Sequence, residues 1–313
     1  MWCWRSRGQE LFYTLDYLSR ELDTCRIIGV IDTDERIKNI GNMQVLPPYS
    51  ISTLAPDSLF IITSGNNQLR QFYLDSLVGK NFVLYNEIYD LQNILNIDRT
   101  TVNRARCASF HIDGMNWYFD TAESEEQLNI FWSEKSIFKQ LFKELDLSNV
   151  IEIACGRGRH VPKYIEAAEH ITLVDILQKN IDICKKRFGE NKKISFYKNN
   201  GYNIELLKDG EYSAIFSYDS MVHFELLDIN SYLNEFYRVL KCGGRALIHH
   251  SNLDAMYNGS FSHSIQHGRA FMNYKIFSYL AINAGFNVLE QRLINWNNQP
   301  DIDCLTLLEK PKK

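Results

Sequence analysis

A short glycine-containing turn limits what this chain of 313 residues can fold into. The segment Val150–His160 reads VIEIACGRGRH, an apolar strand-like run followed by glycines at positions 156 and 158. Because glycine lacks a Cβ, such a turn between a strand and a helix can bring backbone N–H groups close to a ligand. A tight turn that binds nothing is the simpler alternative. Both readings predict a parallel α/β unit.

Two acidic residues indicate which ligand such a turn would bind. A NAD-binding turn needs a third glycine or alanine where this chain has Val161, and Glu152 lies inside the strand itself. An acid there suits a positively charged amine better than a pyrophosphate. Asp175 ends the next predicted strand, 17 residues after Gly158, where a carboxylate can accept both hydroxyls of a ribose. This pair of acids fits S-adenosylmethionine better than a dinucleotide.

The stretch from about residue 108 to residue 310 resembles the class I S-adenosylmethionine-dependent methyltransferases. Their first motif, an acid, two small or apolar residues and then C-G-x-G, is met by residues 152–158, except that Ala154 stands where glycine is more usual. Residues 232–248 match the family's helix, glycine turn and fifth strand, and residues 285–290 and 304–309 match its last two, antiparallel strands. The resemblance implies a Rossmann-like, mostly parallel seven-stranded sheet.

The resemblance also implies which residues bind the donor. Asp175 would hold the ribose, and the residues that follow the predicted strand 194–197 would contact adenine, although aspartate is commoner than Asn200 there. The implied donor-binding residues are Glu152, Ala154, Cys155, Gly156, Gly158, Asp175, Ile176, Asn200, Gly201, Tyr202 and Tyr218.

Candidate catalytic residues follow the predicted fourth and fifth strands, where open α/β sheets bind their ligands. A hydroxyl acceptor benefits from a general base, most often histidine. We hypothesise that His223 or His250 is this base and that Asp219 positions the acceptor or the base. His249 is a further candidate, because neighbouring strand residues point to opposite faces and either histidine of the pair can face a pocket. Each histidine could instead be structural. No compact acid cluster predicts a metal site.

A smaller α/β unit precedes this region. The sequence predicts a helix over residues 9–18, strands over 26–32, 58–65 and 81–84, and a helix over 68–76. The unit shows a weak resemblance to the Rossmann-like N-terminal domains of bacterial sugar-modifying enzymes, whose relatives bind nucleotide-sugars. Its first turn carries a single glycine, so we expect a degenerate domain that binds a nucleotide-sugar or serves as a scaffold.

We therefore predict a domain over residues 1–95, a linker over 96–123 and a methyltransferase domain over 124–313. The latter begins with a helix over residues 124–145, where Ser124 and Gln127 have the spacing of a capping box.

The composition of the chain limits the kinds of partner that we expect it to bind. Lys and Arg number 34 against 38 Asp and Glu, which argues against a dedicated nucleic-acid binder. No apolar run approaches the roughly 20 residues of a membrane-spanning helix. The seven cysteines are scattered, which argues against a disulfide framework and favours a cytoplasmic protein. We expect a small-molecule or sugar substrate, and a homo-oligomer is possible.

The sequence thus predicts methyl transfer from S-adenosylmethionine to a hydroxyl of a sugar, nucleotide-sugar or glycan precursor in bacterial surface-polysaccharide biosynthesis. The alternatives are an N-methyltransferase of a small metabolite and a cofactor-binding module without catalysis. A nicotinamide-dependent dehydrogenase is disfavoured by Val161 and by the missing glycines of the first unit.

Overall fold

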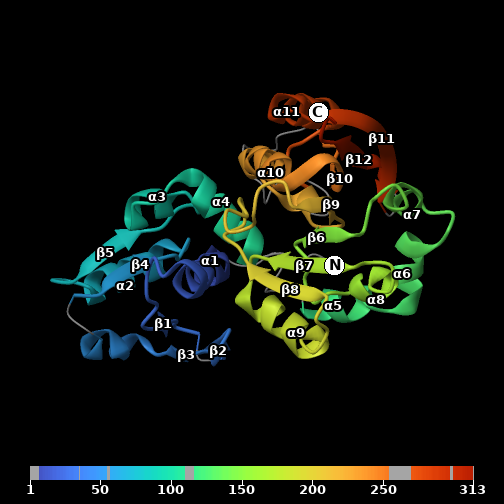
Figure 1. Cartoon of the computed structure of the whole chain (residues 1–313). Coiled ribbons are helices and arrows are strands. Elements are labelled where there is room, and N and C mark those ends of the chain that lie inside the picture. The colour runs from blue at the N-terminus through green and yellow to red at the C-terminus, as the bar shows by residue number, and fades with distance from the viewer. Residues whose placement is uncertain are drawn as a thin grey trace. The chain divides into compact units, whose positions relative to one another are not determined.

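The computed structural model describes residues 7–34, 36–54, 57–109, 116–253, 269–296 and 299–312. The chain divides into two compact units, Met1–Gly114 and Met115–Lys313 (Figure 1). The stretch predicted as a linker, residues 96–123, contains helix α4 (Arg99–Cys107) in the first unit and helix α5 (Asn116–Ala122) in the second.

The first unit is a small α/β unit with two separate sheets. Besides α4, its elements are α1 (Arg7–Leu22), β1 (Val30–Ile31), β2 (Asn39–Ile40), β3 (Met43–Leu46), the 3₁₀ helix η1 (Pro48–Thr53), β4 (Leu59–Ile62), α2 (Asn67–Ser76), β5 (Asn81–Leu84) and α3 (Asp90–Leu95). Strand β3 pairs parallel with β1 and antiparallel with β2, and β4 pairs parallel with β5. The predicted helices and strands are confirmed, but the strand expected over residues 26–32 is only two residues long.

The second unit is built on one seven-stranded sheet. Its strands are β6 (Asn149–Ile153), β7 (His170–Asp175), β8 (Ile194–Lys198), β9 (Tyr212–Ser217), β10 (Leu240–Ser251), β11 (Asn287–Trp296) and β12 (Gln299–Glu309). The strand order is β11-β12-β10-β9-β6-β7-β8, and β12 runs antiparallel to both of its neighbours while the other pairs are parallel. The predicted mostly parallel sheet with an antiparallel final pair is confirmed.

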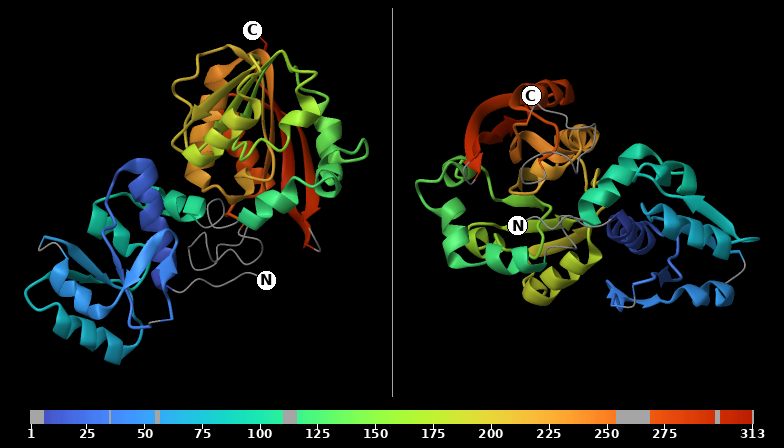
Figure 2. Two further views of the ribbon diagram at one scale, coloured as in Figure 1. Left: turned by 90° about the horizontal axis from the view of Figure 1, so that it is seen from below. Right: turned by 180° about the vertical axis from the view of Figure 1, so that it is seen from behind.

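Helices cover both faces of this sheet (Figure 2). They are α5, α6 (Glu125–Trp132), α7 (Ile137–Phe142), α8 (Val161–Tyr164), α9 (Gln178–Phe188), the 3₁₀ helix η3 (Met221–His223), α10 (Leu226–Val239) and α11 (Tyr274–Ala284). One buried cluster joins the sheet to Phe138 and Phe142 of α7 and Tyr164 of α8. The other joins it to Phe236 of α10 and Phe277 of α11. The sheet is therefore buried on both faces, as a parallel sheet usually is.

The helix predicted over residues 124–145 begins as expected but does not continue. Oγ of Ser124 accepts a hydrogen bond from the backbone N of Gln127 at 3.3 Å, which confirms the predicted cap. The chain then leaves the helix at Ser133, and Ser136 caps a second helix by accepting from the backbone N of Lys139 at 3.0 Å. The prediction of one continuous helix is wrong, because serines end the first helix and start the next.

Within the part of the chain that the structure describes, no helix is both long and apolar enough to cross a membrane.

Candidate active site

The strand order gathers the predicted donor-binding residues at one edge of the sheet. The glycine loop follows β6, Asp175 ends β7, Asn200 follows β8 and Tyr218 follows β9. These four strands are adjacent and parallel, so their carboxyl ends meet at the same edge. Ligands of open α/β sheets bind outside such an edge.

The glycine loop has a left-handed backbone at three positions. Ala154, Gly156 and Gly158 have φ of +55°, +56° and +77°. Only glycine adopts such angles without cost, which explains why glycine is more usual at position 154. At position 158 a Cβ would lie 2.6 Å from Cε2 of Phe188, so glycine is required there by close packing against α9. Ligand access, the reason the sequence suggested, is not needed to explain this glycine.

Asp175 connects the end of β7 to the glycine loop. Its carboxylate accepts hydrogen bonds from the backbone N of Gly156 at 2.8 Å, the backbone N of Leu177 at 2.9 Å and Nδ2 of Asn180 at 3.0 Å. These bonds hold the carboxylate at the carboxyl edge of the sheet, where a ribose would bind. The ribose-binding role of Asp175 stays a prediction.

Glu152 is a buried acid beneath the same loop. Glu152 is only 2% exposed, and its carboxyl accepts a hydrogen bond from Oη of Tyr164 at 2.7 Å. Burial raises the pKa of Glu152 to about 8, so its carboxyl is largely protonated at neutral pH. A positively charged group placed beside it would favour the ionised form. Glu152 is therefore suited to an amine, although this role stays a prediction.

The other predicted donor-binding residues lie in the loops at the carboxyl edge of the sheet. Oδ1 of Asn200 accepts from the backbone N of Tyr202 at 3.2 Å and of Asn203 at 3.0 Å, so this side chain forms the turn that contains Gly201 at φ +88°. Cys155 is buried, and Ile176 is half-buried beside Asp175.

Asp219 lies at the centre of the predicted catalytic side. It follows β9 with φ +58°, an angle that costs energy for any residue but glycine. Its carboxylate accepts hydrogen bonds from Nη2 of Arg159 at 2.9 Å and from the hydroxyl of Tyr118. Burial raises the pKa of Asp219, but the charge of Arg159 and the hydrogen bond from Tyr118 outweigh burial, and the net effect is a pKa below the ordinary value. Asp219 is therefore ionised at neutral pH.

His249 holds the backbone of this aspartate. Nδ1 of the fully buried His249 accepts a hydrogen bond from the backbone N of Asp219 at 3.0 Å. In neutral histidine the proton is then on Nε2, which lies 3.2 Å from Oδ2 of Asp303. This contact is close but does not meet hydrogen-bond geometry in the part of the chain that the structure describes. Arg269 in turn binds both oxygens of Asp303, at 2.8 and 2.5 Å.

His250 points to the opposite face of the sheet. Its Nδ1 lies 2.8 Å from the carbonyl oxygen of Ser251, its Nε2 lies 2.8 Å from Oγ1 of Thr306, and its ring stacks on Phe277 with centroids 3.8 Å apart. Burial lowers the pKa of His250 to about 3. Both ring nitrogens are engaged, which favours a structural role over that of a general base. His223, half-buried in η3 just after β9, remains the better-placed candidate base.

Four residues that the sequence analysis did not assign to the catalytic site complete this cluster. Tyr118, Arg159, Arg269 and Asp303 come from α5, the glycine loop, the segment before α11 and β12. Buried charged residues that pair across the fold could be suspected from sequence only if their partners were known. Among the described residues, no group of three or more His, Cys, Asp or Glu side chains could hold a metal ion.

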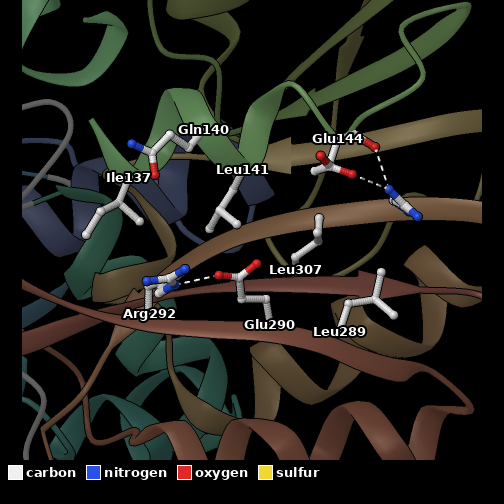
Figure 3. A pocket seen from close by; sticks show the side chains of 9 residues that line it. Ile137, Gln140, Leu141, Glu144, Leu289, Glu290, Arg292 and Leu307 are labelled. Atoms are coloured by element: carbon white, nitrogen blue, oxygen red, sulfur yellow. Dashed lines mark hydrogen bonds and ion pairs between the residues drawn. The ribbon is translucent and has the colours of Figure 1, made fainter. Parts of the chain in front are cut away.

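A hollow of about 270 Å³ lies elsewhere, between α7 and strands β10–β12 (Figure 3). Leu141 and Leu307 line it, and its charged residues pair with one another: Arg292 with Glu290 at 2.5 Å and Arg245 with Glu144 at 3.0 Å. It includes Arg245 near the amino end of β10, away from the carboxyl edge that carries the predicted donor site. We assign it no part in the reaction.

Comparison with known proteins identifies a family match within the second unit. Residues 150–244 match the family described as "Methyltransferase domain". Similar solved structures include an S-adenosylmethionine-dependent methyltransferase from Aquifex aeolicus, 13% identical over 62% of this chain and 97% of that one, with a TM-score of 0.47. Another, from Mesorhizobium loti, is 12% identical over 55% of this chain and 96% of that one, with a TM-score of 0.46. No protein with a curated description matches the sequence.

The second unit thus contains a class I methyltransferase domain, and this family implies S-adenosylmethionine as the methyl donor. The residues at the carboxyl edge fit the donor chemically. A buried carboxyl is suited to its ammonium group, and a second carboxylate at the end of the neighbouring strand is suited to its ribose hydroxyls.

Proposed function

We propose that the enzyme methylates a hydroxyl of a sugar, nucleotide-sugar or glycan precursor, of the kind used in bacterial surface-polysaccharide biosynthesis. The observation that supports this most directly is the ionised carboxylate of Asp219 at the carboxyl end of β9, bonded to Arg159 of the glycine loop. When bound, S-adenosylmethionine supplies an activated methyl group. Asp219 can then accept a hydrogen bond from an acceptor hydroxyl and orient its oxygen.

Two further features favour a hydroxyl acceptor. A neutral hydroxyl is a poor nucleophile, and His223 lies in the turn that follows Asp219, where a general base would be needed. By analogy of fold, the α/β unit that precedes the methyltransferase domain would bind the nucleotide part of an activated sugar.

The test uses the full chain with methyl-labelled S-adenosylmethionine and two acceptor panels of similar size, nucleotide-sugars and primary amines. Formation of S-adenosylhomocysteine is measured with each compound. We expect turnover with a nucleotide-sugar, and a fall of about 100-fold or more in kcat for Asp219→Asn. Turnover of amines alone would indicate the N-methyltransferase instead. Tight binding of S-adenosylhomocysteine without turnover of either panel would support the non-catalytic alternative.

A further inference from the structure

Strand β5 forms an edge of the smaller sheet in the first unit. In the part of the chain that the structure describes, it pairs only with β4 (Figure 1). The backbone N of Tyr85 donates to the carbonyl oxygen of Ile62 at 2.9 Å, so Tyr85 and Val83, two residues earlier, direct their backbone groups toward β4. The backbone N–H and C=O groups of Phe82 and Leu84 therefore point away from β4, along the edge.

This edge carries none of the features that normally keep edge strands apart. Proteins protect an exposed edge with charged side chains, with proline or with a bulge. Residues 81–85 read NFVLY, without a charge or a proline, and the register of β5 with β4 shows no shift. Phe82 and Leu84 are 41% and 39% exposed although both are large and apolar. A regular apolar edge of this kind is a template for pairing with a strand of another chain.

The sequence of β5 is complementary to itself when two copies run antiparallel. With a two-fold axis at Val83, each Phe82 lies opposite Leu84 of the partner subunit, so two apolar pairs form and the outward backbone groups meet. The neighbouring registers that also match these backbone groups are poorer. An axis at Phe82 would place Leu84 opposite the partner's Lys80, and an axis at Leu84 would place Phe82 opposite the partner's Asn86.

We infer that β5 pairs antiparallel with β5 of a second copy of this chain, so that the protein is a homodimer joined at this edge. The two small sheets then form one sheet of four strands, and the same surface of each copy is used, as a two-fold axis requires. Charge favours this arrangement, because Lys80 and Glu87 flank the segment and an antiparallel pair brings opposite signs together. The same α/β module exposes four more large apolar side chains, those of Leu59, Leu69, Phe72 and Val78.

A cysteine at the proposed two-fold axis tests the register on the full chain. Val83→Cys places a thiol opposite its own copy, in a pair without backbone hydrogen bonds, where Cα atoms are about 4.5 Å apart and a disulfide can form. Oxidation with copper–phenanthroline should convert most of this variant to a covalent dimer on a non-reducing gel. In Asn81→Cys, the matched control, the two thiols lie several residues apart along the strands, beyond the reach of a disulfide. Wild type, which keeps the exposed Cys242, reports the background.

Sedimentation and light scattering measure the dimer itself. Phe82→Lys adds a charge to each copy of the edge and removes both apolar pairs, so it should raise the dissociation constant of the dimer about 10-fold or more. Leu206→Lys is the matched control, because Leu206 is 76% exposed but lies in the second unit. This variant should dissociate as wild type does.

Three results would overturn the inference. A wild type that is monomeric at every concentration would leave the edge for a strand of a different protein. A dimer that survives Phe82→Lys would be joined at another surface. Equal cross-linking of Val83→Cys and Asn81→Cys would exclude the proposed register. If Phe82→Lys fails to fold, the two cysteine variants still decide.

Discussion

Glu152→Gln gives a sharp test of the buried acid beneath the glycine loop. Glutamine has nearly the same shape, and its side-chain oxygen can still accept the hydrogen bond from Tyr164, but it does not ionise. Burial raises the pKa of Glu152 from 4.5 to about 8. At pH values between these two pKa values, Glu152 keeps its proton in the folded state but has released it in the unfolded state. The stability of the wild-type protein should therefore fall as pH rises from about 4.5 to about 8.

The size of this effect follows from the two pKa values. Each pH unit in that window costs about 1.4 kcal/mol, and the whole difference is on the order of 5 kcal/mol above pH 8. The variant lacks this loss, so its free energy of unfolding relative to wild type should rise across the window by several kcal/mol. Urea unfolding of both proteins at pH 5.5, 7 and 8.5 measures it.

Glu235→Gln provides a control, because the pKa of Glu235 is shifted in the opposite direction to that of Glu152. Hydrogen bonds from Arg238 lower the pKa of Glu235, so its contribution is lost only as pH falls below its ordinary value of 4.5. Its difference from wild type should stay constant between pH 5.5 and 8.5. A Glu152→Gln difference that is equally flat would refute the argument, because Glu152 would then be ionised in the folded state. Saturating S-adenosylhomocysteine should reduce the wild-type slope, since an ammonium beside Glu152 favours its ionised form.

Three other changes follow from the local geometry. Ala154→Gly should raise the melting temperature or leave it unchanged, because it relieves a φ of +55° that costs about 1 kcal/mol and offsets the entropic cost of glycine. Gly158→Ala should destabilise the domain by roughly 1–3 kcal/mol in urea unfolding and weaken S-adenosylhomocysteine binding in calorimetry, because the new Cβ would meet Phe188. His250→Ala should lower the melting temperature, because it removes the contact with Thr306, and should leave the pH dependence of kcat unchanged. A changed pH profile would restore His250 as a candidate base.

The sequence predicted the sheet well because its strands are buried on both faces. Runs such as Val150–Ile153 and Ile171–Val174 are mostly apolar and buried at every position, and such runs bounded by turns are typical of parallel strands. The two acids were found for the same reason, since Asp175 ends an apolar run and Glu152 interrupts one.

The acceptor side could not be assembled in the same way. His249 and Asp303 are more than 50 residues apart and lie on the antiparallel strands β10 and β12, whose register no local pattern specifies. The sequence alone therefore could not place Asp303 beside His249. Arg159 was overlooked for another reason: in a glycine-rich motif it occupies a position with no required residue type, and only its burial reveals a role.

The contacts of Asp219 argue that donor and acceptor sides are not independent. Its carboxylate is held by a loop that follows β6 and by α5, while its backbone is held by His249 of β10. These contacts offset the backbone strain of an aspartate at φ +58°. One of its supports, Arg159, comes from the glycine loop, and its charge also acts on the Glu152 carboxyl. The loop predicted to bind the donor therefore also holds the carboxylate predicted to meet the acceptor.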